Sequence, residues 1–224
     1  MAAMDVDNPD SQPEFVLRAE LRGHEGQIRA ICVAPNGEII TGAMDATVRR
    51  WRLAPAGGIP PEEVGVVLDH DHWVNALLAL PAGVLEECPE GGFVTGCLDK
   101  RARAYSCPTG AEATRVRLLD GHDGGVISLA WAAGGALIPG SWDGPARRWD
   151  LARGSCVATL RGHENGVCVL GLPSGDVATG STGRPAGSAV VGFPLRLWDA
   201  PLKGGGGGGS SAGLQPRGAQ ADHH

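Results

Sequence analysis

Short runs of apolar residues, separated by turn-forming residues, follow one another along most of the chain. Residues 28–32 and 39–41 are two such runs, and Pro35-Asn36-Gly37 between them is typical of a tight turn. Residues 47–51 then alternate polar and apolar positions before Pro55. These patterns predict short β-strands. No window carries a 3.6-residue apolar period long enough for paired helices, so the pattern disfavours an α-solenoid.

A histidine-containing motif recurs four times. It reads LRGHEGQI, LDHDHWV, LDGHDGGV and LRGHENGV, and its histidines are His24, His70, His122 and His163. An apolar residue follows each histidine four positions later. The histidines lie roughly 40–50 residues apart, which is close to the length of a four-stranded propeller blade.

A second motif lies downstream of each histidine. Its copies are TGAMDATVRRW (41–51), TGCLDKRARAY (95–105), PGSWDGPARRW (139–149) and the interrupted TGSTG…LRLWD (179–199). In the first three copies the aspartate precedes the aromatic residue by six positions. The segment RPAGSAVVGFP (184–194) interrupts the fourth. Four copies in phase predict an all-β chain of about four blades.

Composition narrows the function classes. The 224 residues include 36 Gly and 16 Pro, only 20% are charged, and the net charge is −6. This balance argues against a nucleic-acid partner, which would require clustered Lys and Arg. No apolar run reaches the ~18 residues of a membrane span, and residues 1–10 are acidic rather than signal-like, so we expect no membrane association. The six cysteines form no CxxC pair, which predicts reduced thiols in a cytoplasmic and nuclear protein.

The GH…D…WD pattern resembles the WD-repeat β-propellers over about residues 15–200. More narrowly, the chain is similar to the N-terminal propeller of the phospholipase A-2-activating protein family. The segments that carry this similarity are ELRGHEGQIRAICV (20–33), ECPEGGFVTGCLD (87–99), GSWDGPARRWD (140–150) and LPSGDVATGS (172–181). That family binds ubiquitin through its propeller and reaches an AAA-type unfoldase through C-terminal domains. We expect this sequence to lack those domains and to retain only the ubiquitin-binding part.

The resemblance also implies a hydrogen-bonded tetrad in each blade. It joins the histidine, a second-strand hydroxyl, the turn aspartate and a third-strand tryptophan, and it rigidifies the blade because buried polar groups must be paired. The corresponding residues are His24, Thr41, Asp45 and Trp51; His70, Thr95, Asp99 and Tyr105; His122, Asp143 and Trp149; and His163, Thr179 and Trp198. Tyr105 replaces a tryptophan, Pro139 the third hydroxyl and Gly183 the fourth aspartate. The expectation is one complete tetrad and three damaged ones.

The His, hydroxyl and Asp set could also be taken for a hydrolase triad. A triad occurs once, however, whereas this set recurs in every blade, and the sequence contains no GxSxG elbow. The run Asp69-His70-Asp71-His72 has metal-ligand chemistry, but four consecutive residues cannot easily surround one ion. We therefore predict no catalytic residue, no cofactor and no metal.

In WD propellers the residue after the histidine and the residue before the turn aspartate face one rim. The first position holds Glu25, Asp71, Asp123 and Glu164, and the second holds Met44, Leu98, Trp142 and Thr182, with Trp73 nearby. The acidic residues could simply keep the surface hydrated. The alternative is an apolar patch with an acidic border, which suits a partner whose apolar patch is flanked by Lys and Arg. Ubiquitin is such a partner.

Other functions remain open at this stage. A generic WD-repeat scaffold, such as a substrate receptor of a ubiquitin ligase, would have the same blades. A truncated product without stable function would explain the interrupted fourth blade. We expect a disordered leader over 1–14, a propeller over 15–200 and a Gly-rich disordered tail over 201–224. Residues 15–21 are expected to form an outer strand that pairs with the last blade if the ring closes.

Overall fold

Strands dominate the architecture. The computed structural model describes residues 17–53, 61–181, 183 and 195–199, and these contain fifteen strands, one short 3₁₀ turn at Ala133–Gly135 and no α-helix. The strands form four antiparallel sheets, each built from strands consecutive in the chain. The all-β prediction is therefore confirmed, as is the prediction of four sheets. The expected leader over 1–14 and tail over 201–224 lie outside the described residues.

Each sheet corresponds to one copy of the sequence repeat and is called blade 1 to blade 4 from here on. Blade 1 contains β1 (Ile28–Val33), β2 (Ile39–Ala43), β3 (Val48–Arg52) and β4 (Glu62–Val67). Blade 2 contains β5 (Val74–Leu80), β6 (Gly92–Cys97), β7 (Ala102–Ser106) and β8 (Thr114–Leu119). Blade 3 contains β9 (Val126–Ala132), β10 (Ala136–Ser141), β11 (Ala146–Asp150) and β12 (Ser155–Leu160). Blade 4 contains β13 (Val167–Gly171), β14 (Val177–Ser181) and β15 (Leu195–Trp198).

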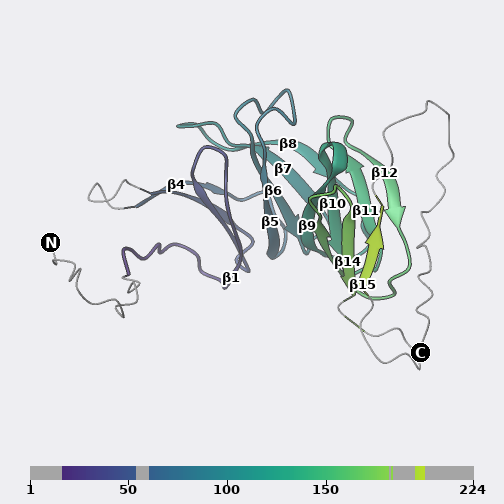
Figure 1. Ribbon diagram of the computed structural model, residues 1–224. Coiled ribbons are helices and arrows are strands. Elements are labelled where there is room, and N and C mark those ends of the chain that lie inside the picture. The colour runs from purple at the N-terminus through teal and green to yellow at the C-terminus, as the bar shows by residue number, and fades with distance from the viewer. Residues whose placement is uncertain (1–16, 54–60, 182, 184–194, 200–224) are drawn as a thin grey trace, which may run out of the picture.

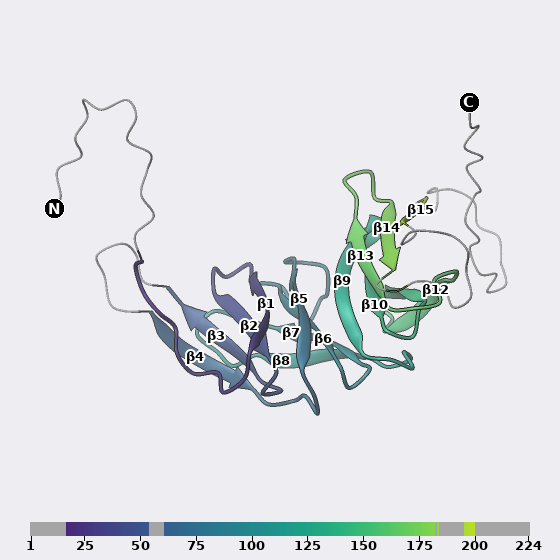
Figure 2. The same ribbon diagram turned by 90° about the horizontal axis from the view of Figure 1, so that it is seen from below.

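The four blades follow one another along an arc (Figures 1 and 2). The first strands of successive blades, β1, β5, β9 and β13, lie next to one another, as the inner strands of a propeller do. Blades 1 and 4 lie at opposite ends of the arc in Figure 2. In the described part of the chain no strand of blade 1 pairs with blade 4, so the arc is open.

The hydrophobic core lies between blades rather than within them. One cluster joins blades 1 and 2 and includes Ile40, Val48, Val74 and Phe93. A second joins blades 2 and 3, and a third joins blades 3 and 4. Because a blade is a single twisted sheet, it can bury its apolar faces only against a neighbouring blade.

A buried ion pair reinforces the contact between blades 1 and 2. Nε of Arg50 donates to Oε2 of Glu38 at 2.8 Å, and Nη1 donates to the carbonyl of Ala111 in blade 2 at 2.8 Å. Both charged side chains are almost fully buried. Their mutual hydrogen bonds offset part of the cost of removing two charges from water.

Blade 4 differs from the sequence-based expectation at its edge. It has three strands, so β15 lies at an edge of the sheet. The expected outer strand over 15–21 is wrong for its described part, because residues 17–21 belong to no strand and Leu17 is exposed. The interrupting segment 184–194 lies outside the described residues. On either side of it, β14 and β15 still pair from Val177–Trp198 to Gly180–Leu195.

Candidate functional site

The first blade carries an unbroken chain of hydrogen bonds from its turn to its third strand. Nδ1 of His24 lies 2.9 Å from Oδ2 of Asp45, and its Nε2 lies 2.7 Å from Oγ1 of Thr41. Nε1 of Trp51 donates to the same hydroxyl at 2.8 Å. Since a carboxylate only accepts, Nδ1 carries the proton and Nε2 accepts from Thr41. The four side chains therefore hold the loop, β2 and β3 together.

Asp45 also fixes its own turn. Its Oδ1 accepts from the amide and the hydroxyl of Thr47, at 3.0 and 2.7 Å, and Oδ2 accepts from the amide of Glu25 at 2.9 Å. Burial alone raises the pKa of this carboxyl, but the hydrogen bonds from Thr47, His24 and Glu25 outweigh it and hold the pKa well below its usual range. Asp45 is thus ionised whenever the blade is folded near neutral pH.

The second blade departs from the expected tetrad at two residues. His70 keeps its contact with Thr95, at 2.9 Å, but Nδ1 of His70 is buried without a hydrogen-bond partner. Asp99 instead accepts two hydrogen bonds from Arg103, at 2.6 and 3.1 Å. The hydroxyl of Tyr105 donates to Asp69 at 3.1 Å instead of reaching Thr95. Asp99 still accepts from the amide of Arg101 in its own turn, but its expected contact with the imidazole of His70 is absent, because Arg103 binds the carboxylate. Tyr105, which already departs from tryptophan in the sequence, bonds Asp69.

The third blade keeps its turn contact but loses the centre of its tetrad. Nδ1 of His122 lies 2.9 Å from Oδ2 of Asp143, as in blade 1. Pro139 occupies the hydroxyl position, and Nε2 of His122 and Nε1 of Trp149 are both buried without partners. The pairing between β10 and β11 is reduced to Leu137 opposite Trp149, which fits the missing N–H of a proline in an inner strand.

The fourth blade keeps the other half of the tetrad. His163 lies 2.8 Å from the hydroxyl of Thr179, and Nε1 of Trp198 donates to that hydroxyl at 2.8 Å. Nδ1 of His163 is buried without a partner, since Gly183 provides no carboxylate. The tetrad hydrogen bonds of each blade join residues of that blade alone.

Burial lowers the pKa of three blade histidines, which favours their neutral form near neutral pH. Burial, and after it the charge of Arg103, lowers the pKa of His70 to about 4. Burial likewise lowers the pKa of His122, although Asp143 opposes it, and that of His163. The imidazoles of His70 and His163 are each bonded to a threonine hydroxyl, and that of His122 to Asp143, so all three have structural partners. In the described residues no three His, Cys, Asp or Glu side chains are placed to hold a metal, and Asp69 is occupied by Tyr105 and Arg115.

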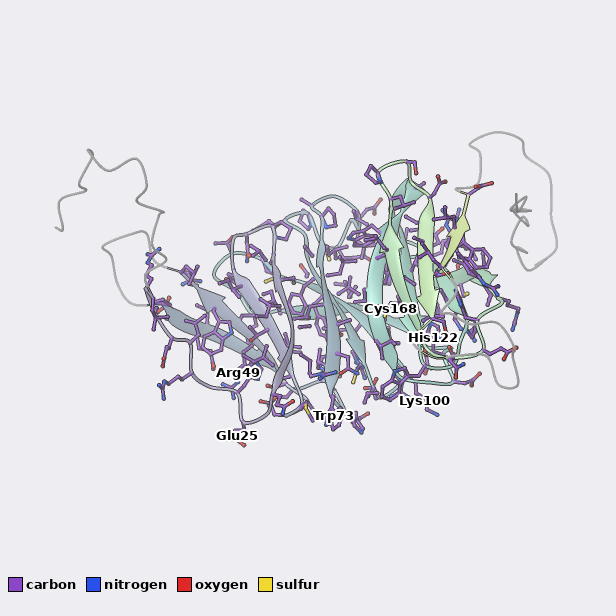
Figure 3. All side chains as sticks on the ribbon, turned by 60° about the horizontal axis from the view of Figure 1, so that its bottom comes forward. Glu25, Arg49, Trp73, Lys100, His122 and Cys168 are labelled. Carbon is purple, nitrogen blue, oxygen red and sulfur yellow. The ribbon has the colours of Figure 1, made fainter. Side chains whose placement is uncertain are left out.

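Repeated backbone hydrogen bonds fix the rim residues within each of blades 1 to 3. The amides of Met44, Leu98 and Trp142 donate to the carbonyls of Gln27, Trp73 and Gly125, at 2.9, 2.9 and 3.0 Å. Each contact ties the turn before the aspartate to the loop after the histidine. Leu98 also reaches the next blade, where its side chain lies against Gly125 and leaves no room for a Cβ there. Figure 3 shows Glu25, Trp73 and Lys100 on the same side of the molecule.

Exposure differs among these rim residues. Trp142 is 55% exposed, and it is the only aromatic residue among the exposed large apolar side chains of the described residues. Met44, Trp73 and Leu98 are half-buried, and Thr182 lies outside the described residues. Glu25, Asp71, Asp123 and Glu164 are all exposed. Trp142, Leu98, Trp73 and Met44 with these four acidic residues are called the rim surface below.

Sequence reasoning missed two basic residues at the rim. Lys100, at the tip of the blade 2 turn, is exposed. Arg101 lies 3.7 Å from Asp71 and 3.3 Å from Asp120. The border of the rim surface therefore carries both positive and negative charges at blade 2 and negative charges at blades 1, 3 and 4. Alignment of the repeats could have revealed Lys100, because it places this residue directly after the turn aspartate.

Comparison with known proteins identifies the repeat. A family model described as "WD domain, G-beta repeat" matches residues 15–52 and 154–184. The chain carries WD40 repeats. Two solved structures share the fold of this WD40-repeat chain. "Structure of U3-55K" matches with a TM-score of 0.62 and 23% identity, over 81% of this chain and 51% of that one. "Crystal structure of RRP9 WD40 repeats" matches with a TM-score of 0.58 and 22% identity, over 72% and 47%.

The curated relatives that match this chain include several different kinds of protein. The "Ribosome biogenesis protein WDR12 homolog" of Chlamydomonas reinhardtii is 27% identical over 216 residues, covering 84% of this chain and 46% of the relative. The "Phospholipase A-2-activating protein" of Xenopus laevis is 30% identical over 157 residues, covering 68% and 18%. The chain spans less than half the length of the curated relatives it matches. The narrower resemblance is thus one among several of similar strength.

In the part of the chain that the structure describes, no helix is long and apolar enough to span a membrane. All six cysteines are described, and all are free thiols.

Proposed function

We propose that this WD-repeat protein-interaction scaffold binds ubiquitin or ubiquitylated proteins through its rim surface and does not catalyse a reaction. The proposal places it in ubiquitin-dependent protein degradation or ubiquitin homeostasis, in the cytoplasm and nucleus. The observation that carries it is the 55% exposure of Trp142, whose turn is hydrogen-bonded to the loop that carries the exposed Asp123. Aromatic residues are enriched among the side chains that dominate binding energy.

Charge supports the same partner class. Ubiquitin presents an apolar patch bordered by basic residues, and the rim surface offers apolar side chains beside Glu25, Asp123 and Glu164. Complementary charge favours encounter and register, while the buried apolar centre contributes most of the affinity. Lys100 reduces this complementarity at blade 2 alone. An AAA-type unfoldase would be reached only through further domains.

Titration of ¹⁵N-labelled ubiquitin with the full chain tests the proposal. We expect chemical-shift changes confined to the apolar patch of ubiquitin. The double variant Trp73→Ala/Trp142→Ala should weaken binding by at least ~30-fold, which corresponds to about 2 kcal/mol for loss of interface anchors.

A matched control separates the rim surface from general apolar exposure. Leu118 lies on β8, an outer strand, and is 42% exposed, so Leu118→Ala should leave the titration unchanged. Unchanged affinity in the double variant would remove the rim surface as the site. Recovery of ubiquitin-ligase subunits in a pull-down without ubiquitin would favour the substrate-receptor alternative.

A further inference from the structure

Both ends of the arc expose apolar side chains. At the blade 1 end, Ile28, Ile31 and Val33 of β1 are 48%, 64% and 58% exposed. These three residues are called the front face. At the blade 4 end, Leu170 of β13 and Leu195 and Leu197 of β15 are 61%, 71% and 64% exposed. These three residues are called the back face.

The front face occupies repeat positions that other blades use for packing. Ile31 lies opposite Thr41 in the sheet, just as Leu77 lies opposite Thr95 and Leu129 opposite Pro139. Leu77 packs into the cluster shared with blade 1, and Leu129 into the cluster shared with blade 2.

Ile28 follows the same rule. Its counterparts four residues after the histidine are Val74, Val126 and Val167, and each is 0% exposed. The front face is therefore the surface that a blade presents to the blade before it.

The back face occupies the complementary repeat positions. Leu195 lies opposite Gly180, as Val48 lies opposite Gly42 and Ala102 opposite Gly96. Val48 is 0% exposed and Ala102 1% exposed, because each packs into an inter-blade cluster.

Leu170 shows the same relation on the first strand. It lies opposite Ala178, as Cys32 lies opposite Ile40 and Leu78 opposite Val94. Cys32 and Leu78 pack into the clusters between blades 1 and 2 and between blades 2 and 3. The back face is the surface that a blade presents to the blade after it.

We propose that a second copy of this chain covers both faces. The back face of each copy packs on the front face of the other, and so continues the inter-blade contact that the chain already makes three times. A head-to-tail contact closes into a ring when its rotation allows. Two copies of four blades give eight, within the ~4–8 blades of propellers, whereas three copies would exceed it.

Light scattering coupled to size-exclusion chromatography of the full chain tests this proposal. We expect a mass twice the 23.0 kDa of one chain. Ile31→Glu blocks the front face and Leu195→Glu blocks the back face. Each variant alone should be monomeric and keep the circular-dichroism spectrum of the parent, because both side chains are exposed in a single copy. Leu118→Glu, on the outer strand of blade 2, is the matched control and should remain a dimer.

Mixing the two blocked variants tests the geometry itself. The Ile31→Glu copy retains its back face and the Leu195→Glu copy retains its front face, so an equimolar mixture should form a heterodimer through one intact contact. A monomeric parent chain, a dimer of either blocked variant alone, or a mixture that stays monomeric would each overturn the proposal. A species larger than two chains would overturn the closed ring.

Discussion

Two prolines leave three buried polar atoms of blade 3 without partners. Pro139 provides no hydroxyl for Nε2 of His122 and Nε1 of Trp149, whereas Thr41 satisfies both counterparts in blade 1. Pro145 provides no amide for Oδ1 of Asp143, whereas Thr47 donates to the equivalent oxygen of Asp45. Each unsatisfied buried group costs ~1–3 kcal/mol, so blade 3 gives up stability that blade 1 retains.

Restoring the hydroxyl should recover part of that stability. Pro139→Thr is expected to raise the free energy of unfolding by about 1–3 kcal/mol, as measured by urea denaturation. Pro139→Val is the matched control, because it restores the backbone N–H and a β-branched side chain without the hydroxyl. Equal stability of the Thr and Val variants would contradict the role assigned to the tetrad hydroxyl.

The buried histidines make stability depend on pH. His70 has a folded pKa of about 4, below its unfolded value of ~6.5, so the fold favours the neutral form. The stability that this provides is complete above the unfolded pKa and is lost as pH falls from about 6.5 to about 4. The free energy of unfolding should therefore decrease over that window.

Substitution of single histidines shows which of them causes this pH dependence of stability. His70→Gln should flatten the slope without abolishing it, because His122 and His163 also have lowered pKa values. His72→Gln is the control, since His72 lies in the same loop as His70 but is exposed. An unchanged slope in His70→Gln would show that burial of this imidazole does not carry the effect.

At the scale of the element, the tight turn after each aspartate repeats one backbone conformation. The residue that follows the aspartate has a positive φ in three blades: 63° at Ala46, 76° at Lys100 and 99° at Gly144. Side chains with a Cβ rarely adopt this region, and glycine does so without penalty. Blades 1 and 2 therefore hold a strained residue where blade 3 has none.

Exchanging glycine and alanine at this turn should have opposite effects. Ala46→Gly is expected to stabilise the chain by up to ~1 kcal/mol. Gly144→Ala should destabilise it by more, because its Cβ would lie 2.7 Å from the carbonyl of His163 as well as adopt the strained φ. Thermal denaturation of both variants measures the two shifts, and shifts of the same sign would contradict this account of the turn.

The repeat in the sequence was enough to predict the strands and their turns, because apolar alternation and turn residues act locally. The partners of Asp99 and Tyr105 were not predictable in this way. Asp99 lies within reach of Arg103 only when β6 and β7 pair, and Tyr105 meets Asp69 from another part of the blade. The repeat places Lys100 after the turn aspartate, but its exposure on the rim depends on the geometry of the turn.

At the scale of the whole molecule, the open arc separates two kinds of surface. The rim surface combines one exposed aromatic residue with exposed acidic residues, which suits a transient partner. The front and back faces have aliphatic side chains at positions that are buried elsewhere in the repeat, which suits a permanent contact.

Binding of ubiquitin at Trp142 is the central claim, and one comparison tests it most directly. Labelled ubiquitin is titrated with the parent chain, with Trp142→Ala and with Leu118→Ala, and the shifts of the ubiquitin apolar patch are followed by NMR. The account predicts saturable shifts with the parent and with Leu118→Ala, and their loss or a marked weakening with Trp142→Ala. Equal titration curves for all three proteins would contradict it.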